Sequence, residues 1–332
     1  MNIAITGATG FIGKALLEEL SKDASLKITI VVRMPTEGKF DSIVVGDLVQ
    51  ARDLASVLKG FDVVIHLAAR VHMMREGNSD PLSEYRRVNV SASLNLAKQA
   101  ARAGVRRFIF LSSIKVNGDY TKPSETFSSE ISSGRLQLLL LQLGKDKISN
   151  HLDYYALSKF EAEQGLRKIA EKTEMELVVI RPPLVYGAGV KGNFFKMMKW
   201  VNGTFPLPFG GIKNLRSLVY VENLTSLIAI CIQHPKAANQ TFLVSDGQDL
   251  STSELLQYLA TFLGSRSTLL KFPQSLLKWS LLILGRKDVY SRLCGNLQLD
   301  IEETCQLLTW KPPVCVEKGL SITAKAWLEK HN

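Results

Sequence analysis

The stretch that decides the fold lies near the start of the chain and reads Thr6-Gly7-Ala8-Thr9-Gly10-Phe11-Ile12-Gly13. It follows an apolar, strand-like run over residues 2–6 and opens a segment with apolar residues at helical spacing over residues 11–20. In such a strand–turn–helix, Gly7 permits the tight turn, Gly10 lets the backbone approach a pyrophosphate, and Gly13 lets the helix pack closely on the strand. Free N–H groups at the helix start attract phosphate. The stretch therefore predicts a dinucleotide-binding loop, with a purely structural turn as the alternative.

Beyond this loop, strand-like runs alternate with helical patterns. The strand-like runs cover residues 27–33, 42–45, 62–67, 107–111 and 176–180, and the helical patterns cover residues 51–59, 81–103 and 153–172. Because the strands are almost continuously apolar, both faces of their sheet should be covered by helices. The pattern predicts an α/β fold of the Rossmann type, with a doubly wound parallel sheet.

The regular alternation stops after residue 181. Residues 187–217 are rich in Gly, Pro and Asn, which indicates long loops. We therefore expect residues 1–181 to form a dinucleotide-binding domain, to which strands or helices of the later chain can return. Residues 182–332 should form a smaller C-terminal α/β lobe that binds substrate. The leucine-rich segment 124–152 favours a helix that packs on the body, with a mobile flap as the alternative.

The chain is basic, with 41 Lys and Arg against 31 Asp and Glu and a net charge of +10. Such a surplus indicates an anionic partner: nucleic acid, a membrane surface or a phosphorylated small molecule. Basic runs with interleaved aromatic residues do not occur, which argues against nucleic acid. The apolar run Leu276 to Leu284 falls short of the about 20 residues of a membrane span, so we expect no span there. A surface-lying amphipathic segment remains open at this place.

Cysteine usage and the N-terminus bear on the compartment. The four cysteines form no C-x-x-C pair, and they are Cys231, Cys294, Cys305 and Cys315. This predicts free thiols in a reducing compartment rather than disulfides or a zinc ribbon, and no metal site is expected. The chain starts directly on a strand-like run, without the pattern of a signal peptide, which predicts a cytoplasmic protein.

A candidate catalytic group follows the fifth strand-like run. Tyr155 and Lys159 stand at positions i and i+4 of a helical pattern and so share one face. An ammonium group this close should lower the pKa of the tyrosine, which could then move a proton to and from a carbinol. Ser112 and Ser113 stand at the end of the strand, where ligands of open α/β sheets bind. We expect Ser113 to orient the reacting oxygen and Ser112 to be structural.

These motifs together are similar to the extended short-chain dehydrogenase/reductase superfamily. The G-x-x-G-x-x-G loop, Asp47-Leu48, His66-Leu67-Ala68-Ala69 and Asn89-Val90 all resemble family elements. Two departures stand out, because Tyr154 replaces the usual proline before the catalytic tyrosine and Asn117 replaces a tyrosine. The resemblance implies that the cofactor is contacted by Gly7, Thr9, Gly10, Phe11, Ile12, Gly13, Asp47, Leu48, Leu67, Ala68, Ala69, Asn89, Tyr155 and Lys159.

The end of the second strand indicates which nicotinamide cofactor is bound. A carboxylate there would bind the ribose 2′-hydroxyl of NAD, whereas an arginine accommodates the 2′-phosphate of NADP. The chain has Arg33 at this point and no carboxylate before Glu37. We therefore expect NADP(H), with Arg33 on the 2′-phosphate. The alternative is a solvated Arg33 and NAD(H).

The residues after position 181 indicate the substrate. The run Arg181 to Gly187 is similar to the R-P-x-x-V-Y-G of nucleotide-sugar epimerases, dehydratases and reductases. That resemblance implies a nucleotide-diphosphate sugar held by Asn193, by Arg216 and, as a second phosphate contact, by Arg292. A guanidinium suits a bidentate hold on phosphate. The alternative for each of the three is an ordinary surface or loop residue.

The stretches Val71 to Glu76 and Ser112 to Gly118 resemble the bacterial UDP-glucose 4-epimerase-like group, which includes reductases of UDP-4-keto-6-deoxy-N-acetylhexosamines in surface-polysaccharide synthesis. The resemblance implies hydride transfer at C4 of a nucleotide sugar. Arg33 favours a 4-keto reductase that consumes NADPH. The alternatives are a 4-epimerase that retains NAD and, least favoured, a non-catalytic protein that senses NADP. A homodimer is implied by family analogy alone.

Overall fold

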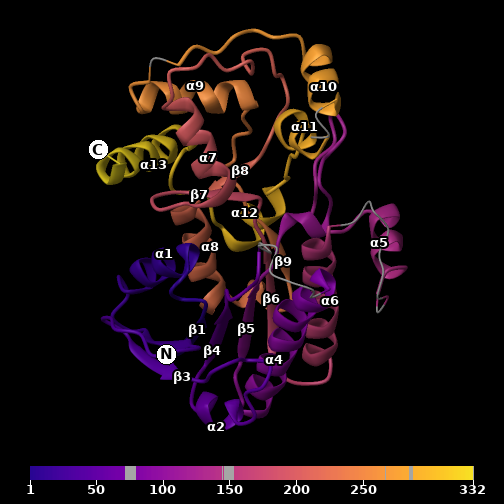
Figure 1. The fold of residues 1–332 in the computed structure, drawn as a ribbon. Helices are drawn as coiled ribbons and strands as arrows, with labels where there is room; N and C mark the ends of the chain where they lie inside the picture. Colours follow the sequence, from indigo (N-terminus) through magenta and orange to yellow (C-terminus); the bar gives the residue numbers. More distant parts are fainter. Residues whose placement is uncertain (72–79, 144, 146–152, 266, 284–286, 332) are drawn as a thin grey trace.

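The computed structural model describes residues 1–71, 80–143, 145, 153–265, 267–283 and 287–331 (Figure 1). Its main sheet has seven strands in the order β3-β2-β1-β4-β5-β6-β9. All neighbouring strands run parallel. The strands are β1 (Asn2–Thr6), β2 (Lys27–Val32), β3 (Asp41–Val44), β4 (Val63–His66), β5 (Arg107–Leu111), β6 (Glu176–Arg181) and β9 (Thr241–Leu243). The order reverses between β1 and β4, which confirms the doubly wound Rossmann-type sheet.

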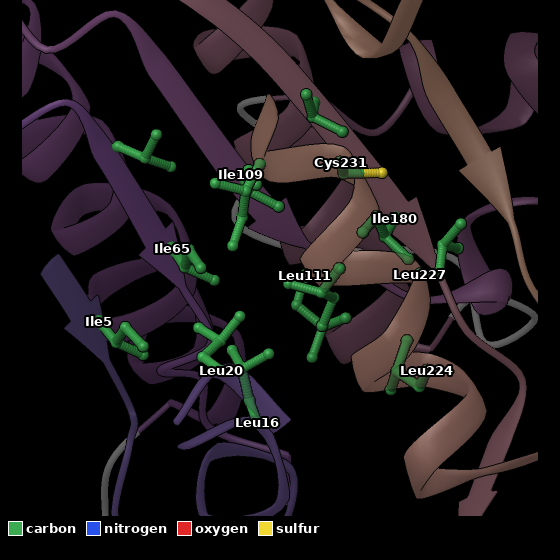
Figure 2. Close-up of a cluster of buried hydrophobic side chains, with 14 of the residues drawn as sticks. Ile5, Leu16, Leu20, Ile65, Ile109, Leu111, Ile180, Leu224, Leu227 and Cys231 are labelled. Atoms are coloured by element: carbon green, nitrogen blue, oxygen red, sulfur yellow. The ribbon is translucent and has the colours of Figure 1, made fainter. Parts of the chain in front are cut away.

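Helices cover both faces of this sheet. One face carries α1 (Phe11–Leu20) and α8 (Val221–Gln233), and the other carries α2 (Leu54–Leu58), α4 (Ala92–Arg102) and α6 (Tyr154–Ala170) (Figure 1). Figure 2 shows the first interface, where side chains of α1 and α8 meet side chains of the central strands. The labelled residues are Ile5, Leu16, Leu20, Ile65, Ile109, Leu111, Ile180, Leu224, Leu227 and Cys231. Burial on both faces explains why the strands are almost continuously apolar.

A smaller lobe follows β6 beyond the carboxyl ends of the strands (Figure 1). A two-stranded parallel sheet, β7 (Leu184–Tyr186) with β8 (Leu218–Tyr220), lies at its base. Its helices are α7 (Gly192–Val201), α9 (Thr252–Phe262), α10 (Gln274–Ile283), α11 (Lys287–Cys294), α12 (Glu302–Leu308) and α13 (Val316–His331). Tyr186, Phe194, Leu259 and Leu320 belong to its buried core.

Two later elements lie on the cofactor sheet. Helix α8 packs on α1, and β9 extends the sheet beyond β6. We therefore propose that the dinucleotide-binding unit consists of residues 1–181 together with these returning elements, and that most of residues 182–332 forms the second lobe.

The expected helix over residues 81–103 is present but not uniform. It runs as α3 (Pro81–Tyr85), a π-helical segment Arg86–Ser91 and α4. π-Helical turns inside α-helices are frequent at functional sites. The segment widens the helix at Asn89, which contacts the chain after β4. The apolar pattern of the sequence does not predict this local change.

Part of segment 124–152 is the expected helix. Residues Ser133–Leu140 form α5, and Leu139 is buried against Leu157 and Phe160. Residues 144 and 146–152 lie outside the described part. The four cysteines are free thiols. Among the described residues, no helix is long and apolar enough to cross a membrane, and no group of acidic, His or Cys side chains could hold a metal ion.

Candidate functional site

The glycine-rich loop lies between β1 and α1, and two of its glycines are required by close contacts. Gly7 has φ of 74°, and a Cβ there would lie 2.6 Å from the Ala68 nitrogen. A Cβ on Gly13 would lie 2.3 Å from the Gly7 oxygen. Gly10 donates its N–H to the Gly7 oxygen at 3.0 Å and caps α1. A side chain at Gly7 would therefore push the loop away from the chain after β4, and a side chain at Gly13 would push α1 away from the loop.

The start of α1 is the part of the loop that a phosphate could reach. Thr9 and Gly10 are exposed, and Phe11 and Ile12 are half-buried. The first N–H groups of a helix have no partner within the helix, so they form a ready anion site. A cradle in which glycines bring backbone this close to a helix start fits a dinucleotide pyrophosphate.

Asn89 holds the loop after β4 in place. It is 1% exposed, and its Oδ1 accepts a hydrogen bond from the Arg70 nitrogen at 2.8 Å. Its Nδ2 donates to the Arg70 oxygen at 3.1 Å and to Ser158 Oγ at 3.0 Å. Asn89 therefore ties the chain after Leu67, Ala68 and Ala69 to α6, and its direct contact with the cofactor stays a prediction.

Two arginines flank the predicted adenine-contacting residues. Asp47 accepts a hydrogen bond from the Val49 nitrogen at 3.0 Å and pairs with Arg87 Nη1 at 2.7 Å. The Val49 N–H first, then Arg87 and Arg33, lower the pKa of Asp47. Arg33 is exposed at the end of β2. The backbone oxygen of Leu48 accepts a hydrogen bond from Asn95 Nδ2 at 2.7 Å, which ties this loop to α4. Arg87 went unnoticed in the sequence, since it lies far along the chain and belongs to no motif.

Ser113, Tyr155 and Lys159 come together at the carboxyl end of β5. A hydrogen bond from Ser113 reaches the Tyr155 side chain. Lys159 is 2% exposed, and its Nζ donates to the Leu111 oxygen at 2.8 Å and lies 4.4 Å from the centre of the Phe110 ring. Burial lowers the pKa of Lys159 to about 7, and Glu163 opposes that shift. The three side chains expected from the sequence therefore share one site.

The expected direction of the Tyr155 pKa shift is wrong for this structure. Burial and the Asp153 carboxylate raise the pKa of Tyr155, while the Ser113 hydrogen bond lowers it. The Lys159 ammonium donates to the carbonyl of Leu111. Burial penalises the phenolate of Tyr155 directly. Burial also favours the neutral amine of Lys159, which weakens the positive charge that would otherwise stabilise the phenolate.

Asp153 and Lys115 form an ion pair beside Tyr155. Asp153 is the N-cap of α6 and accepts a hydrogen bond from the Tyr155 nitrogen at 2.8 Å. The Asp153 cap stabilises the start of α6, which in the family pattern a proline before the tyrosine favours. Tyr154, which stands in place of that proline, is exposed. The capping rule could have identified Asp153, because Asp immediately before a helical pattern is a typical N-cap.

A buried polar cluster surrounds Ser112, the residue before Ser113. The Ser112 hydroxyl donates to Glu163 Oε1 at 2.5 Å. Arg181 Nη2 pairs with Glu163 Oε2 at 2.5 Å, and Arg181 Nη1 donates to Asn117 Oδ1 at 3.0 Å. Asn117 also donates to the backbone oxygens of Ser128 and Glu130. The departure at Asn117 thus supplies an acceptor for Arg181, and Ser112 has the structural role that the sequence suggests.

The predicted substrate residues lie in the second lobe. Asn193 is exposed in the first turn of α7. Arg216 is half-buried, its Nη1 donates to the Gly295 oxygen at 2.9 Å, and burial lowers its pKa. None of the ion pairs of the described residues involves Arg216. A partly desolvated guanidinium without a carboxylate suits an anionic ligand. Arg292 lies in α11, and its side chain is outside the described part of the structure.

Comparison with known proteins gives consistent results. The model of the NAD dependent epimerase/dehydratase family matches residues 3–245. A relative from Vibrio cholerae named UDP-glucose 4-epimerase is 43% identical over 100% of this chain and 97% of its own length. A relative from Escherichia coli O157:H7, named N-acetyl-alpha-D-glucosaminyl-diphospho-ditrans,octacis-undecaprenol 4-epimerase, is 27% identical over 89% of this chain and 81% of its own.

Solved structures share the fold. A UDP-glucose 4-epimerase from Thermotoga maritima, solved with UDP-glucose, has a TM-score of 0.75 at 20% identity, with 100% of both chains covered. MoeE5, solved with UDP-glucuronic acid and NAD, has a TM-score of 0.73 at 21% identity, covering 99% of this chain and 100% of its own.

Proposed function

The chain belongs to the NAD-dependent epimerase/dehydratase family, and from this premise we propose that it is a 4-epimerase of a nucleotide-diphosphate sugar. The grouping of Ser113, Tyr155 and Lys159 at the end of β5 is the observation that carries the proposal. The names of the two relatives both describe 4-epimerases of hexoses joined to a diphosphate. That diphosphate is the group that we assign to Arg216.

The cradle around Gly7, Gly13 and the start of α1 fits a nicotinamide dinucleotide, which supplies a hydride acceptor and donor when bound. Tyr155 accepts the proton of the 4-hydroxyl as the sugar is oxidised and returns it as the ketone is reduced. Ser113 holds the same oxygen by a hydrogen bond, which keeps it within reach of Tyr155. Lys159, in its charged form, favours the phenolate from within the buried end of β5. Over both half-reactions, proton and hydride return to the sugar.

Reduction of a 4-keto sugar is the second candidate, and Arg33 favours it. The two activities differ in cofactor consumption. With UDP-glucose or UDP-N-acetylglucosamine and no stoichiometric cofactor, we expect the sugar to be interconverted with its 4-epimer. Chromatography of the nucleotide sugars measures this conversion. Stoichiometric oxidation of NADPH with UDP-4-keto-6-deoxy-N-acetylglucosamine, without such interconversion, would establish the reductase instead.

The cofactor preference is a separate prediction, supported by Arg33 and Arg87 around Asp47. This prediction belongs to the reductase candidate, for which NADP(H) should bind more tightly than NAD(H). Arg33→Asp should weaken NADP(H) binding by roughly tenfold to hundredfold, because a charge-assisted hydrogen bond to the 2′-phosphate is lost. Isothermal titration with both cofactors measures this. A parent protein that prefers NAD would contradict it. Lys39→Asp is the control, because Lys39 is an exposed cation just before β3.

Three further properties stay predictions of the family resemblance. They are a homodimer, a cytoplasmic location and a role in surface-polysaccharide precursor synthesis.

A further inference from the structure

Helix α10 presents an apolar face to solvent at the far end of the second lobe (Figure 1). Leu276, Trp279 and Ile283 are 53%, 66% and 80% exposed. Their spacing of three and then four positions places them on one side of the helix. Leu277, by contrast, is 5% exposed and anchors the helix to the lobe. Contiguous exposure of large apolar side chains on one helix face indicates an interaction surface.

The chain that leads into α10 extends this surface. Leu270 and Phe272 are also exposed large apolar residues. The Leu270 nitrogen donates to the Leu207 oxygen at 2.9 Å, so this approach to the helix is held by the loop after α7. Lys271 stands between the two apolar side chains and is exposed. The surface thus combines apolar side chains with positive charge.

The same stretch contains a large part of the basic surplus. Residues 265–292 hold six Lys and Arg but only one acidic residue, Asp288. Their net charge of +5 is half of the +10 of the whole chain. The cofactor and the substrate account for few of these cations, since Arg292 alone among them has a predicted phosphate contact. An apolar helix within a cationic stretch complements a surface that is both anionic and apolar.

We propose that α10 docks on the surface of an anionic phospholipid bilayer. Its 10 residues are half of the about 20 that a crossing helix needs, so it would lie in the headgroup region. Leu276, Trp279 and Ile283 insert between the lipids, and Trp is well suited to this interface because it is apolar with one polar N–H. The exposed Lys271 pairs with a lipid phosphate while its stem stays in the apolar layer.

A second copy of the chain is a less suitable occupant of this face. A symmetric dimer brings the same patch of both subunits together, so two stretches that each carry a net charge of +5 would be brought close to one another. Like charges at this density repel, whereas an anionic bilayer attracts them.

Docking would orient the second lobe toward the lipid. Helix α11 follows α10, and directly after it the Gly295 oxygen accepts hydrogen bonds from Arg216 and from Asn214, each at 2.9 Å. One short helix therefore separates the docking surface from the arginine that we assign to the substrate diphosphate. The docking surface itself does not depend on that assignment.

Vesicle sedimentation with the full-length protein tests the proposal. The protein should pellet with vesicles of phosphatidylcholine that contain phosphatidylglycerol, less with phosphatidylcholine alone, and less as salt rises. Ile283→Glu should lower the partition coefficient by roughly tenfold to hundredfold, because it loses one buried isoleucine. Ile322→Glu makes the same change on α13, at the other end of the lobe, and should bind like the parent.

Tryptophan fluorescence gives an independent readout. Trp310 and Trp327 are buried, whereas Trp279 and Trp200 are exposed. A blue shift on adding anionic vesicles should come from Trp279, so it should be lost in Trp279→Phe, which should still pellet, and should persist in Trp200→Phe. Equal pelleting of Ile283→Glu and the parent would overturn the proposal. So would a change of mass of Ile283→Glu in light scattering without lipid, since a second copy would then cover α10. Turnover of a soluble nucleotide sugar should be unchanged in Ile283→Glu, so failure of docking is distinguishable from failure of the proposed activity.

Discussion

Replacing Tyr155 by phenylalanine is expected to lower kcat by about 10²–10⁴-fold, the usual contribution of a positioned acid–base group. The substitution removes only the hydroxyl that Ser113 contacts. The ring remains, with its edge contact to Tyr85 at a centroid distance of 6.2 Å, so the fold should be preserved. The loss should therefore fall on kcat much more than on KM, because the hydroxyl acts on the reacting oxygen.

Tyr154→Phe is the matched control for this prediction. It makes the same chemical change one residue earlier, on a side chain that is exposed. Steady-state kinetics of both variants, with circular dichroism to check the fold, separate catalysis from structure. If Tyr155→Phe retained parental turnover, the assignment of the acid–base group would be refuted.

Replacing Arg181 by methionine should cost about 3–5 kcal/mol of unfolding free energy, because it leaves a buried carboxylate without its partner. Glu163 is 0% exposed and Arg181 is 2% exposed in this pair. Arg167 Nη2, 3.8 Å from Glu163, can replace part of the lost charge, so the lower end of the range is expected. Arg106→Met is the control. Arg106 is 44% exposed in its pair with Glu176, and the loss there should be at most about 1 kcal/mol.

The pH dependence of stability gives a second signature of the buried pair. Burial alone would raise the pKa of Glu163. Arg181, and after it Ser112, lower this pKa by more than burial raises it, so the net shift is downward. A lowered pKa in the folded state contributes stability above the unfolded pKa of about 4.3, and this is lost as pH falls. Without Arg181, burial raises the pKa, so the sign reverses and the variant loses stability as pH rises.

Urea unfolding of both proteins at about pH 4 and about pH 7 checks this reversal, since these values bracket the unfolded pKa. The difference in unfolding free energy between the parent and Arg181→Met should be larger at the higher pH. A difference that does not change with pH would mean that Glu163 titrates alike in both proteins, contrary to the prediction.

Most of the cofactor half of the fold could be predicted because its signals are local. The spacing of Gly7, Gly10 and Gly13 encodes a turn and a close approach within one strand–turn–helix unit. Tyr155 and Lys159 share a helix face whatever surrounds the helix, since their spacing alone determines it. Position at the end of β5 then brings Ser113 to them, as the rule for parallel sheets predicts.

The remaining features depend on residues that are distant in the chain. The buried polar cluster draws on separate parts of the chain, so no spacing in the sequence predicts it. Its members are Ser112, Asn117, Glu163 and Arg181. The pairing of Arg87 with Asp47 and that of Lys115 with Asp153 are hidden in the same way.

The sequence by itself determined which groups meet at the end of the sheet, because helix and strand periodicity are properties of the local backbone. Only the tertiary structure decided the direction of the Tyr155 pKa, the partners of the buried charges and the exposure of α10. These depend on which surfaces are removed from water, and that is settled when elements far apart in the chain pack together.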